Sequence, residues 1–245
     1  MDELKFKAAY EAVIANERIR KGIGTLGEKS LHAVLKNYYE PNKENHEVKV
    51  GKYVADIVGE NGIIEIQTRH FSRLVDKIEG FLDFSDVTVV YPIAKIKYIK
   101  WIDTETGEIT ERRRSPKKGS IYNVIPELYR IKYTLDNPRM HIKLCMLETE
   151  ETRLLDGKTE TRKKGATKAD IIPTSLDSEI SLNCPSDYKL FIPAGMASEY
   201  TSKDFAKAAH ISLDVAQTTL NLLTYLKITR KVGKKGRNNL YYNVF

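Results

Sequence analysis

The stretch EVKVGKYVADIVGENGIIEIQ, residues 47–67, decides the fold that this sequence predicts. Gly51 and the Glu-Asn-Gly turn at residues 60–62 divide it into short segments, and turn residues of this kind between short apolar runs are typical of β-hairpins. The stretch therefore predicts two successive hairpins, with strands at residues 47–50, 52–58 and 63–67.

Helices are expected on both sides of these strands. Apolar residues recur at helical spacing within residues 4–20, and Thr25 can cap a second helix at 25–39. A third helix is predicted at 70–84, followed by a buried β-branched strand at 87–91 that Pro92 ends. A strand, a helix and a strand in this order form a parallel crossover. The predicted fold class is α/β (α+β), a mixed sheet flanked by helices.

The middle of the chain carries weaker patterns. It predicts a hairpin at 97–114, a helix at 122–135, a strand at 141–147 and a hairpin at 151–162. Residues 163–193 have weak periodicity and three prolines, so connecting structure is expected there.

The C-terminal region predicts two helices joined by about three residues. Thr201 or Ser202 caps the first, which runs through Ala209, and Ser212 caps the second, at 213–226. A hairpin follows, with a basic turn at 233–237. The predicted domains are 1–150, a connecting hairpin and linker at 151–195, and 196–245.

Composition excludes several protein classes and favours a polyanionic partner. The chain has 245 residues with a net charge of +7, and residues 195–245 carry eight basic and three acidic side chains, a net charge of +5. A concentrated basic region suggests nucleic acid, although a solvated surface gives the same pattern. Two cysteines provide no disulfide framework or four-cysteine zinc site. No membrane segment or signal peptide is evident, so a cytoplasmic location is expected.

Acidic residues interrupt the predicted sheet at two places. Asp56 lies within one strand, whereas Glu65 and Gln67 point to the same face of the next. Buried carboxylates are costly without a compensating cation, and Mg²⁺ is typically bound by one or two carboxylates. These residues predict a metal site, and an edge hairpin with outward polar residues is the alternative.

With this order of elements, the residues resemble the PD-(D/E)xK nuclease superfamily over about residues 20–92. The resemblance implies a restriction-endonuclease-like sheet in which Asp56, Glu65 and the Ile66 carbonyl bind Mg²⁺ or Mn²⁺. It also implies a further ligand or supporting contact from Glu28. Gln67 stands where most members have lysine, and it can orient a water molecule but adds no positive charge.

Two arginines follow this motif at the start of the predicted third helix. Arg69 and Arg73 are candidate phosphate contacts near a helix N-terminus, and a solvated helix start is the alternative.

The C-terminal region resembles winged helix-turn-helix modules. The resemblance implies that its second helix enters the DNA major groove through polar residues that include Gln217, Thr218 and Asn221. The wing residues Lys234, Lys235 and Arg237 would contact phosphates or the minor groove. Some winged helices instead bind proteins.

The expected function is therefore metal-dependent endonucleolytic cleavage of double-stranded DNA, with a possible homodimer for double-strand cutting. The alternative is a non-catalytic DNA-binding protein or transcriptional regulator on a degenerate nuclease scaffold, and a third class is a protein-interaction adaptor. A second basic run at residues 112–118 fits either phosphate contact or a solvated loop.

Overall fold

The computed structural model describes residues 3–20, 30–157 and 165–244, without the side chains of residues 15–20. The chain divides into two compact units, each assembled from separated segments. The first unit comprises Met1–Gly59, Pro92–Gly119 and Cys145–Glu179, and the second comprises Glu60–Tyr91, Ser120–Leu144 and Ile180–Phe245.

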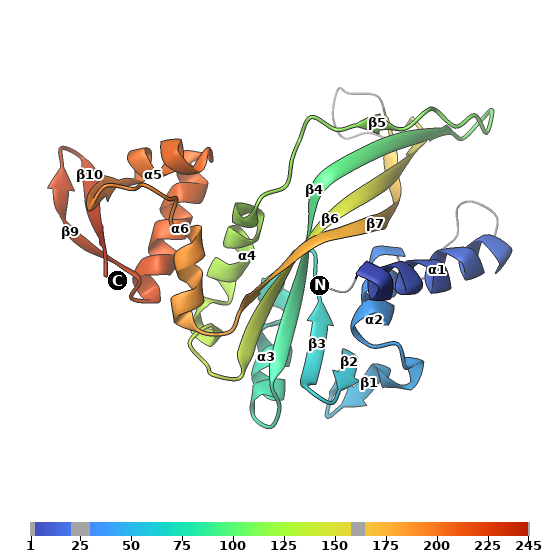
Figure 1. The fold of residues 1–245 in the computed structure, drawn as a ribbon, viewed down its shortest axis with the longest axis horizontal. Coiled ribbons are helices and arrows are strands. Elements are labelled where there is room, and N and C mark those ends of the chain that lie inside the picture. Colours follow the sequence, from blue (N-terminus) through green and yellow to red (C-terminus); the bar gives the residue numbers. More distant parts are fainter. Residues whose placement is uncertain (1–2, 21–29, 158–164, 245) are drawn as a thin grey trace. The chain divides into compact units, whose positions relative to one another are not determined.

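Seven of the described strands form one large mixed sheet, and the chain also contains helices (Figure 1). This mixed α+β class is the coarse fold that the sequence predicts. Along the sheet the strands follow the order β1 (His46–Val50), β2 (Tyr53–Gly59), β3 (Gly62–Ile66), β4 (Val87–Asp103), β6 (Met140–Leu155) and β7 (Thr167–Leu182), with β5 (Arg113–Arg114) paired to β4.

The first unit begins with two packed helices, α1 (Glu3–Arg20) and α2 (Ser30–Tyr39). The buried side chains of α1 include Phe6, Ala9 and Val13, whose spacing keeps them on one helical face. Phe6 meets Tyr38 of α2 edge-on, with ring centroids 5.6 Å apart. The predicted first helix is thus confirmed, as is the first hairpin, in which β1 and β2 pair antiparallel.

A parallel crossover organises the second unit. β3 pairs with β4 in parallel, with Glu65 opposite Val89, and the connection contains η2 (Phe71–Arg73) and α3 (Val75–Leu82). The predicted strand-helix-strand crossover is confirmed. The predicted helix at 70–84 is shorter, because His70 adopts a left-handed backbone (φ 64°) and only a 3₁₀ turn follows it.

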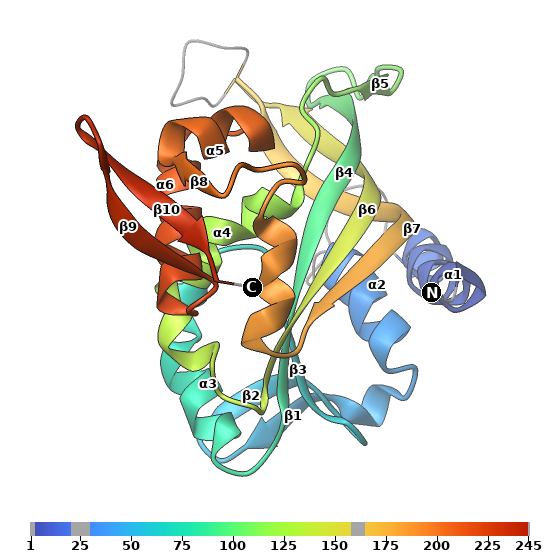
Figure 2. The ribbon, with the colours of Figure 1, turned by 60° about the vertical axis from the view of Figure 1, so that its left-hand side comes forward.

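The C-terminal part of the second unit contains the two predicted helices and the hairpin. Only three residues join α5 (Ser202–Ala209) to α6 (Leu213–Tyr225). β8 (Glu199–Thr201), β10 (Asn238–Asn243) and β9 (Thr229–Lys235) then form an antiparallel sheet in that order. Tyr200, Phe205 and Leu220 belong to the buried core of this part. The β9–β10 hairpin projects from the helices (Figure 2).

Contrary to the prediction, Pro92 does not end its strand. β4 continues through it to Asp103. β3 ends at Ile66, which is paired with Val90, and the Gln67 N–H donates to the Val90 carbonyl, so Pro92 lies at the end of the pairing with β3, where a missing N–H is tolerated.

Residues 163–193 also differ from the prediction of connecting structure. Described residues from Thr167 to Leu182 form β7, and η5 (Pro185–Phe191) follows. β7 lies at the end of the strand order, where many of its side chains are only partly buried and Pro173 is tolerated. The consecutive apolar residues Ile171, Ile172 and Pro173 interrupt the alternation along this strand. The predicted strand at 158–162 lies outside the described residues.

The predicted helix at 122–135 is three short helical segments rather than one. These are η3 (Ile121–Val124), α4 (Ile125–Arg130) and η4 (Lys132–Thr134). Among the described residues, no helix combines the length and apolarity needed to cross a membrane.

Candidate functional site

Glu65 is a buried carboxylate at the centre of the candidate site. Its side chain is 3% exposed on β3, and its Oε2 atom accepts a hydrogen bond from the ammonium group of Lys77 over 2.6 Å. Lys77 extends from α3, the crossover helix that follows the strand. The expectation of a desolvated position for Glu65 is confirmed, and an amine from the protein compensates its charge.

Lys77 is a residue that the sequence reasoning missed. It lies on α3 beside the buried residues Leu74, Ile78 and Phe81, and only 18% of its side chain is exposed. A lysine three residues after one buried apolar residue and four before another sits on the inner flank of a helix. That spacing is the signal that identifies it, and it gives a positive charge to a site whose motif lacks lysine.

Gln67 is held by contacts within its own loop. Its backbone N–H donates to the Val90 carbonyl over 2.9 Å, and its side-chain amide donates to the Arg69 carbonyl over 2.7 Å. The amide nitrogen is therefore engaged with the backbone. Any role in orienting a water molecule would fall mainly to its carbonyl oxygen.

Arg69 and Arg73 are exposed, but the predicted helix N-terminus does not lie beside Arg69. A regular helix begins only at Val75. At the preceding turn, the Phe71 N–H donates to Glu127 of α4 over 2.9 Å. Burial raises the pKa of the Glu127 carboxyl, but hydrogen bonds from this N–H and from Arg130 outweigh it and lower the pKa overall. The protein's own carboxylate thus occupies an anion position at this turn.

The remaining acidic candidates are not brought together by the described structure. Asp56 is half-buried on β2 of the first unit, between the fully buried residues Ala55 and Ile57. Glu65 belongs to the second unit, and Glu28 lies outside the described residues. Convergence of the three carboxylates and the Ile66 carbonyl on one ion therefore stays a prediction.

The chemistry of these donors fits a hard cation, since carboxylate and carbonyl oxygens are the ligands of Mg²⁺ and Mn²⁺. Within the described segments, no group of three His, Cys, Asp or Glu side chains is arranged to hold a metal ion. The set that the resemblance implies includes Glu28, beyond those segments.

The second helix of the C-terminal pair presents a polar face. Gln217 and Asn221 are exposed and lie one turn apart on α6, whereas Ala216 and Leu220 are buried. Thr218 is only half-exposed, and its hydroxyl donates to the Asp214 carbonyl over 2.8 Å. Gln217 and Asn221 therefore offer amide groups for recognition, while the hydroxyl of Thr218 is already bonded within the helix.

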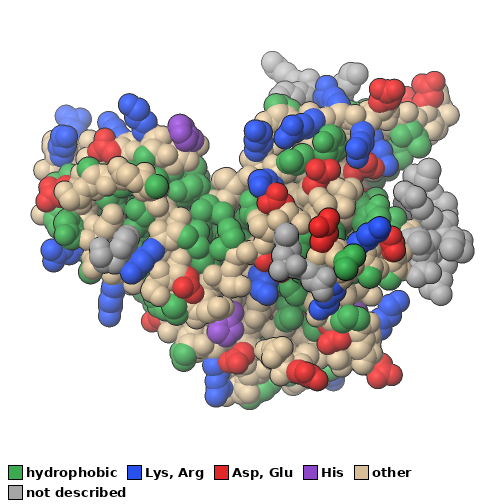
Figure 3. All heavy atoms as spheres, in the orientation of Figure 1, with side chains coloured by type: hydrophobic (Ala, Val, Ile, Leu, Met, Phe, Trp, Pro, Cys, Tyr) green, Lys and Arg blue, Asp and Glu red, His purple; other side chains and the backbone are tan. Residues whose placement is uncertain are grey.

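The hairpin next to these helices carries a dense positive charge. Lys234, Lys235 and Arg237 are all exposed near the turn, where Gly236 adopts a left-handed backbone (φ 62°). Arg230 lies over the Tyr242 ring at 5.3 Å from its centroid. Figure 3 shows Lys and Arg side chains around this part of the surface. A polyanion would meet an ordered strand pair rather than a loose tail.

Comparisons with known proteins bear on residues 29–183, which match the family model described as "Domain of unknown function (DUF8091)". An uncharacterized protein of Treponema pallidum (strain Nichols) is 32% identical over 143 residues, 58% of this chain and 57% of that protein. The match thus spans little more than half of that relative. No solved structure gives a significant match.

Proposed function

This chain belongs to the DUF8091 family, whose description assigns no function, and from its own residues we propose that it is a metal-dependent DNA endonuclease with a winged helix-turn-helix region for DNA binding. Asp56 and Glu65 both lie inside the family match, whereas α5, α6 and the β9–β10 hairpin lie beyond it. The proposal thus assigns chemistry to the family domain and additional DNA contact to the C-terminal part.

The observation that carries the proposal is the buried Glu65 carboxylate with the Lys77 ammonium 2.6 Å away. The strand holds a carboxylate and its crossover helix holds an amine in the same desolvated position. A carboxylate can bind a cation and an amine can offset the charge of a phosphodiester, so both groups suit this chemistry. In this proposal Lys77 supplies the positive charge that Gln67 lacks. A carboxylate accepts several bonds, so Lys77 does not prevent Glu65 from acting as a ligand.

Asp56, Glu65, the Ile66 carbonyl and Glu28 are the residues proposed to hold Mg²⁺ or Mn²⁺. A bound ion of this kind lowers the pKa of a coordinated water and offsets charge on a phosphate. The chain's own contribution is to keep the Glu65 carboxylate oriented by Lys77 and shielded from bulk water, with 3% of its side chain exposed.

DNA binding is proposed for the exposed amides of α6 and the basic hairpin. Gln217 and Asn221 can form bidentate hydrogen bonds with base edges, and the hairpin cations can contact phosphates. The close joint between α5 and α6 and the sheet order β8-β10-β9 support the winged-helix interpretation. Arg69 and Arg73 are exposed candidates for further phosphate contacts.

Cleavage assays test the enzymatic part of the proposal. Supercoiled plasmid, four-way junction and flap DNA are incubated with the protein and Mg²⁺ or Mn²⁺, and nicked and linear products are measured. We expect cleavage that Asp56→Asn and Glu65→Gln abolish. Lys77→Met should slow it by about 100-fold or more, with Lys77→Arg retaining part of the rate.

The matched control is Glu79→Gln, which removes an exposed carboxylate from α3 and should leave the rate unchanged. DNA affinity of each variant, measured by fluorescence anisotropy, separates lost chemistry from lost binding. Intact substrates with both ions, despite tight DNA binding, would contradict the nuclease proposal.

A second candidate function is DNA binding without cleavage, as in a transcriptional regulator. It is favoured by the engagement of the Gln67 amide with the Arg69 carbonyl and by the Lys77 ammonium, which already balances the Glu65 charge. In that case, DNA affinity would fall steeply with salt, and neither wild type nor any variant would cleave DNA with Mg²⁺ or Mn²⁺. Absence of any salt-dependent DNA affinity would instead indicate a protein-interaction role.

A further inference from the structure

The basic run at residues 112–118 is an ordered edge of the first unit. Arg113 and Arg114 form β5 and pair with Ile99 and Tyr98 of β4. The Ser115 N–H then donates to the Lys97 carbonyl over 2.7 Å, and farther along, the Gly119 N–H donates to the Ala94 carbonyl over 3.0 Å. Backbone hydrogen bonds therefore hold Arg113, Arg114 and Ser115 along β4, whereas residues 116–118 are exposed and have no regular secondary structure. Phosphate contact and a solvated loop both stay predictions for this run.

Aromatic rings of β4 orient two of the guanidinium groups. The Cζ atom of Arg113 lies 4.6 Å from the centroid of the Trp101 ring, and Arg112 lies at the same distance from Tyr98. A guanidinium stacked on a ring is attracted by the π-electrons and keeps its N–H groups available in its own plane. Much of the side-chain entropy that binding would cost has thus already been lost.

Charge on this edge is only partly balanced. Glu150 contacts Lys100 at 2.6 Å and Arg112 at 3.8 Å, and Asp177 contacts Lys95 at 2.7 Å. No ion pair of Arg113, Arg114, Lys117 or Lys118 occurs within the described part of the chain, and all four side chains are exposed. The middle and far end of the run therefore present uncompensated positive charge next to an indole ring.

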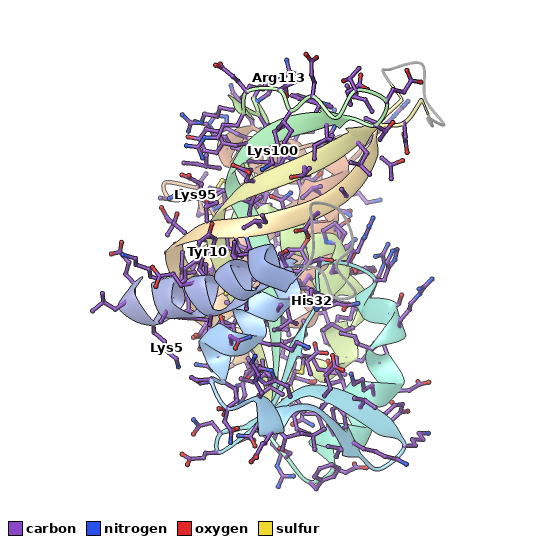
Figure 4. All side chains as sticks on the ribbon, turned by 90° about the vertical axis from the view of Figure 1, so that its right-hand side faces the viewer. Lys5, Tyr10, His32, Lys95, Lys100 and Arg113 are labelled. Atoms are coloured by element: carbon purple, nitrogen blue, oxygen red, sulfur yellow. The ribbon has the colours of Figure 1, made fainter. Side chains whose placement is uncertain are left out.

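We propose that this basic edge, formed by Lys95, Lys100, Trp101 and residues 112–118, binds the phosphodiester backbone of nucleic acid. Lys95, Lys100 and Arg113 lie one after another along β4 and the adjoining β5 (Figure 4), and Figure 3 shows Lys and Arg side chains gathered over the same end of the unit. Phosphates spaced along a strand match cations spaced along an edge. The contact is additional to the hairpin and does not require cleavage.

The row of cations favours a nucleic acid backbone over an acidic peptide. Guanidinium groups form bidentate bonds with carboxylate and phosphate alike, but a backbone with one charge at every nucleotide engages several cations together and releases their counterions. The backbone belongs to DNA in the proposed function. RNA shares this chemistry, so the experiment compares the two.

Trp101 provides a direct measurement because it is the single tryptophan of the chain. Its emission is recorded during metal-free titration with a 20-base-pair DNA duplex, a single-stranded DNA of equal length, an RNA duplex and poly-glutamate. A background with Lys234, Lys235 and Arg237 changed to Gln removes the hairpin contribution. We expect saturable changes in Trp101 emission with nucleic acid, and none with poly-glutamate at equal charge.

The decisive variant changes Arg113, Arg114 and Lys117 to Gln in that background. Three lost phosphate contacts should reduce the slope of log K against log salt by about 2 to 3, measured by anisotropy. The matched control changes Lys43, Lys49 and Lys52, three exposed cations of the first unit away from β5, and should retain the slope.

An unchanged Trp101 emission with every nucleic acid would overturn the proposal, as would equal slopes for the two triple variants. Equal binding of poly-glutamate would show a general anion surface and overturn it as well. Preference between the DNA and RNA duplexes identifies which backbone the edge binds. Because no metal is present, failure here is distinct from failure to cleave DNA.

Discussion

At the scale of single residues, the Glu65–Lys77 pair is a largely buried ion pair. Both groups are largely removed from water, and each compensates charge on the other. Removing one partner of a buried pair typically costs far more than replacing both, because the remaining charge is left unpaired. The pair consequently matters for stability whether or not it takes part in cleavage.

We predict that Lys77→Met lowers the free energy of unfolding by about 3–5 kcal/mol, whereas the double variant Lys77→Met/Glu65→Leu recovers much of that loss. Urea denaturation followed by circular dichroism measures both. Asp76→Asn, at an exposed position of the same helix, should change the midpoint by little. Additive effects of the two substitutions would contradict the coupling.

Tyr39, the last residue of α2, belongs to a second polar cluster, with Glu179 and Cys145. Its hydroxyl donates to Glu179 over 2.6 Å and lies 2.7 Å from the Cys145 sulfur. Burial, reinforced by Cys145 and Glu179, raises the pKa of Tyr39 well above its usual range. The folded protein therefore holds this phenolic proton at a pH where the unfolded chain releases it.

Tyr39→Phe should reduce the free energy of unfolding by about 1–3 kcal/mol at pH 7, since it removes a hydrogen bond donated to the Glu179 carboxylate. The contribution from the raised pKa is present below pH ~10 and declines as the pH rises above that value. Denaturation midpoints between pH 8 and pH 11 should therefore fall less steeply for Tyr39→Phe. Parallel pH dependences would refute this assignment.

At the scale of elements, α5 depends on a reciprocal cap. The Thr201 hydroxyl accepts from the Asp204 N–H over 3.3 Å, and the Asp204 carboxylate accepts from the Thr201 N–H over 2.9 Å. These bonds satisfy donors at the first turn and hold the Asp204 pKa below its usual range, the Thr201 N–H being the largest cause.

Thr201→Ala should destabilise the protein by about 1 kcal/mol, and Thr201→Ser by much less, because serine keeps the accepting oxygen. Thermal unfolding compares the two variants with wild type. An equal loss for serine would point to the lost methyl group rather than to the cap.

The hairpin cations are proposed to contribute to DNA binding and are exposed, so we expect folding not to require them. Changing Lys234, Lys235 and Arg237 to Gln should weaken duplex binding and reduce its salt slope by about 2 to 3, with the unfolding temperature nearly unchanged. Anisotropy across a salt series tests the first expectation, and calorimetry tests the second. A large fall in unfolding temperature would assign these residues a structural role.

Element patterns determined how much of this fold was predictable. The helix α1, the β1–β2 hairpin and the parallel β3–β4 pair follow from local periodicity and turn chemistry, and each is observed. The predicted end of the strand at Pro92 was wrong because a proline ends a strand only where a neighbouring strand would accept a hydrogen bond from its position. β7 was missed because the consecutive apolar residues Ile171, Ile172 and Pro173 interrupt its alternation, and the proline suggested a connection.

The candidate site was predictable in part for a related reason. The burial of Glu65 follows from the helices predicted on both sides of its strand, which cover the face that it shares with Ile63. Its partner Lys77 is twelve residues away, and only the three-dimensional path of the crossover brings them together. The stacking of Arg113 on Trp101 likewise depends on strand register, which the order of residues alone does not specify.

At the scale of the whole molecule, acidic conditions should weaken the fold. Burial raises the pKa of Glu151, but Arg153 and neighbouring lysines outweigh it and lower the pKa overall, and the Glu127 pKa is lowered as well. Because the folded pKa values lie below those of the unfolded chain, this stability is present above pH ~4.3 and is lost as the pH falls further.

Free energies of unfolding measured from pH 7 to pH 3 should therefore decline, and Glu151→Gln should show a shallower decline from a lower starting value. Its four contacts with Lys97, Arg153 and Lys168 account for that lower start. A decline identical to wild type would exclude Glu151 as a contributor.

The interleaved path of the chain also has a consequence for its synthesis. Neither compact unit is a continuous stretch, and the first unit includes residues as late as Glu179. Most of the polypeptide must therefore emerge from the ribosome before either unit can acquire all of its strands. Early segments such as α1 and β1 emerge long before their later neighbours, a period in which chaperones would have their main opportunity to act.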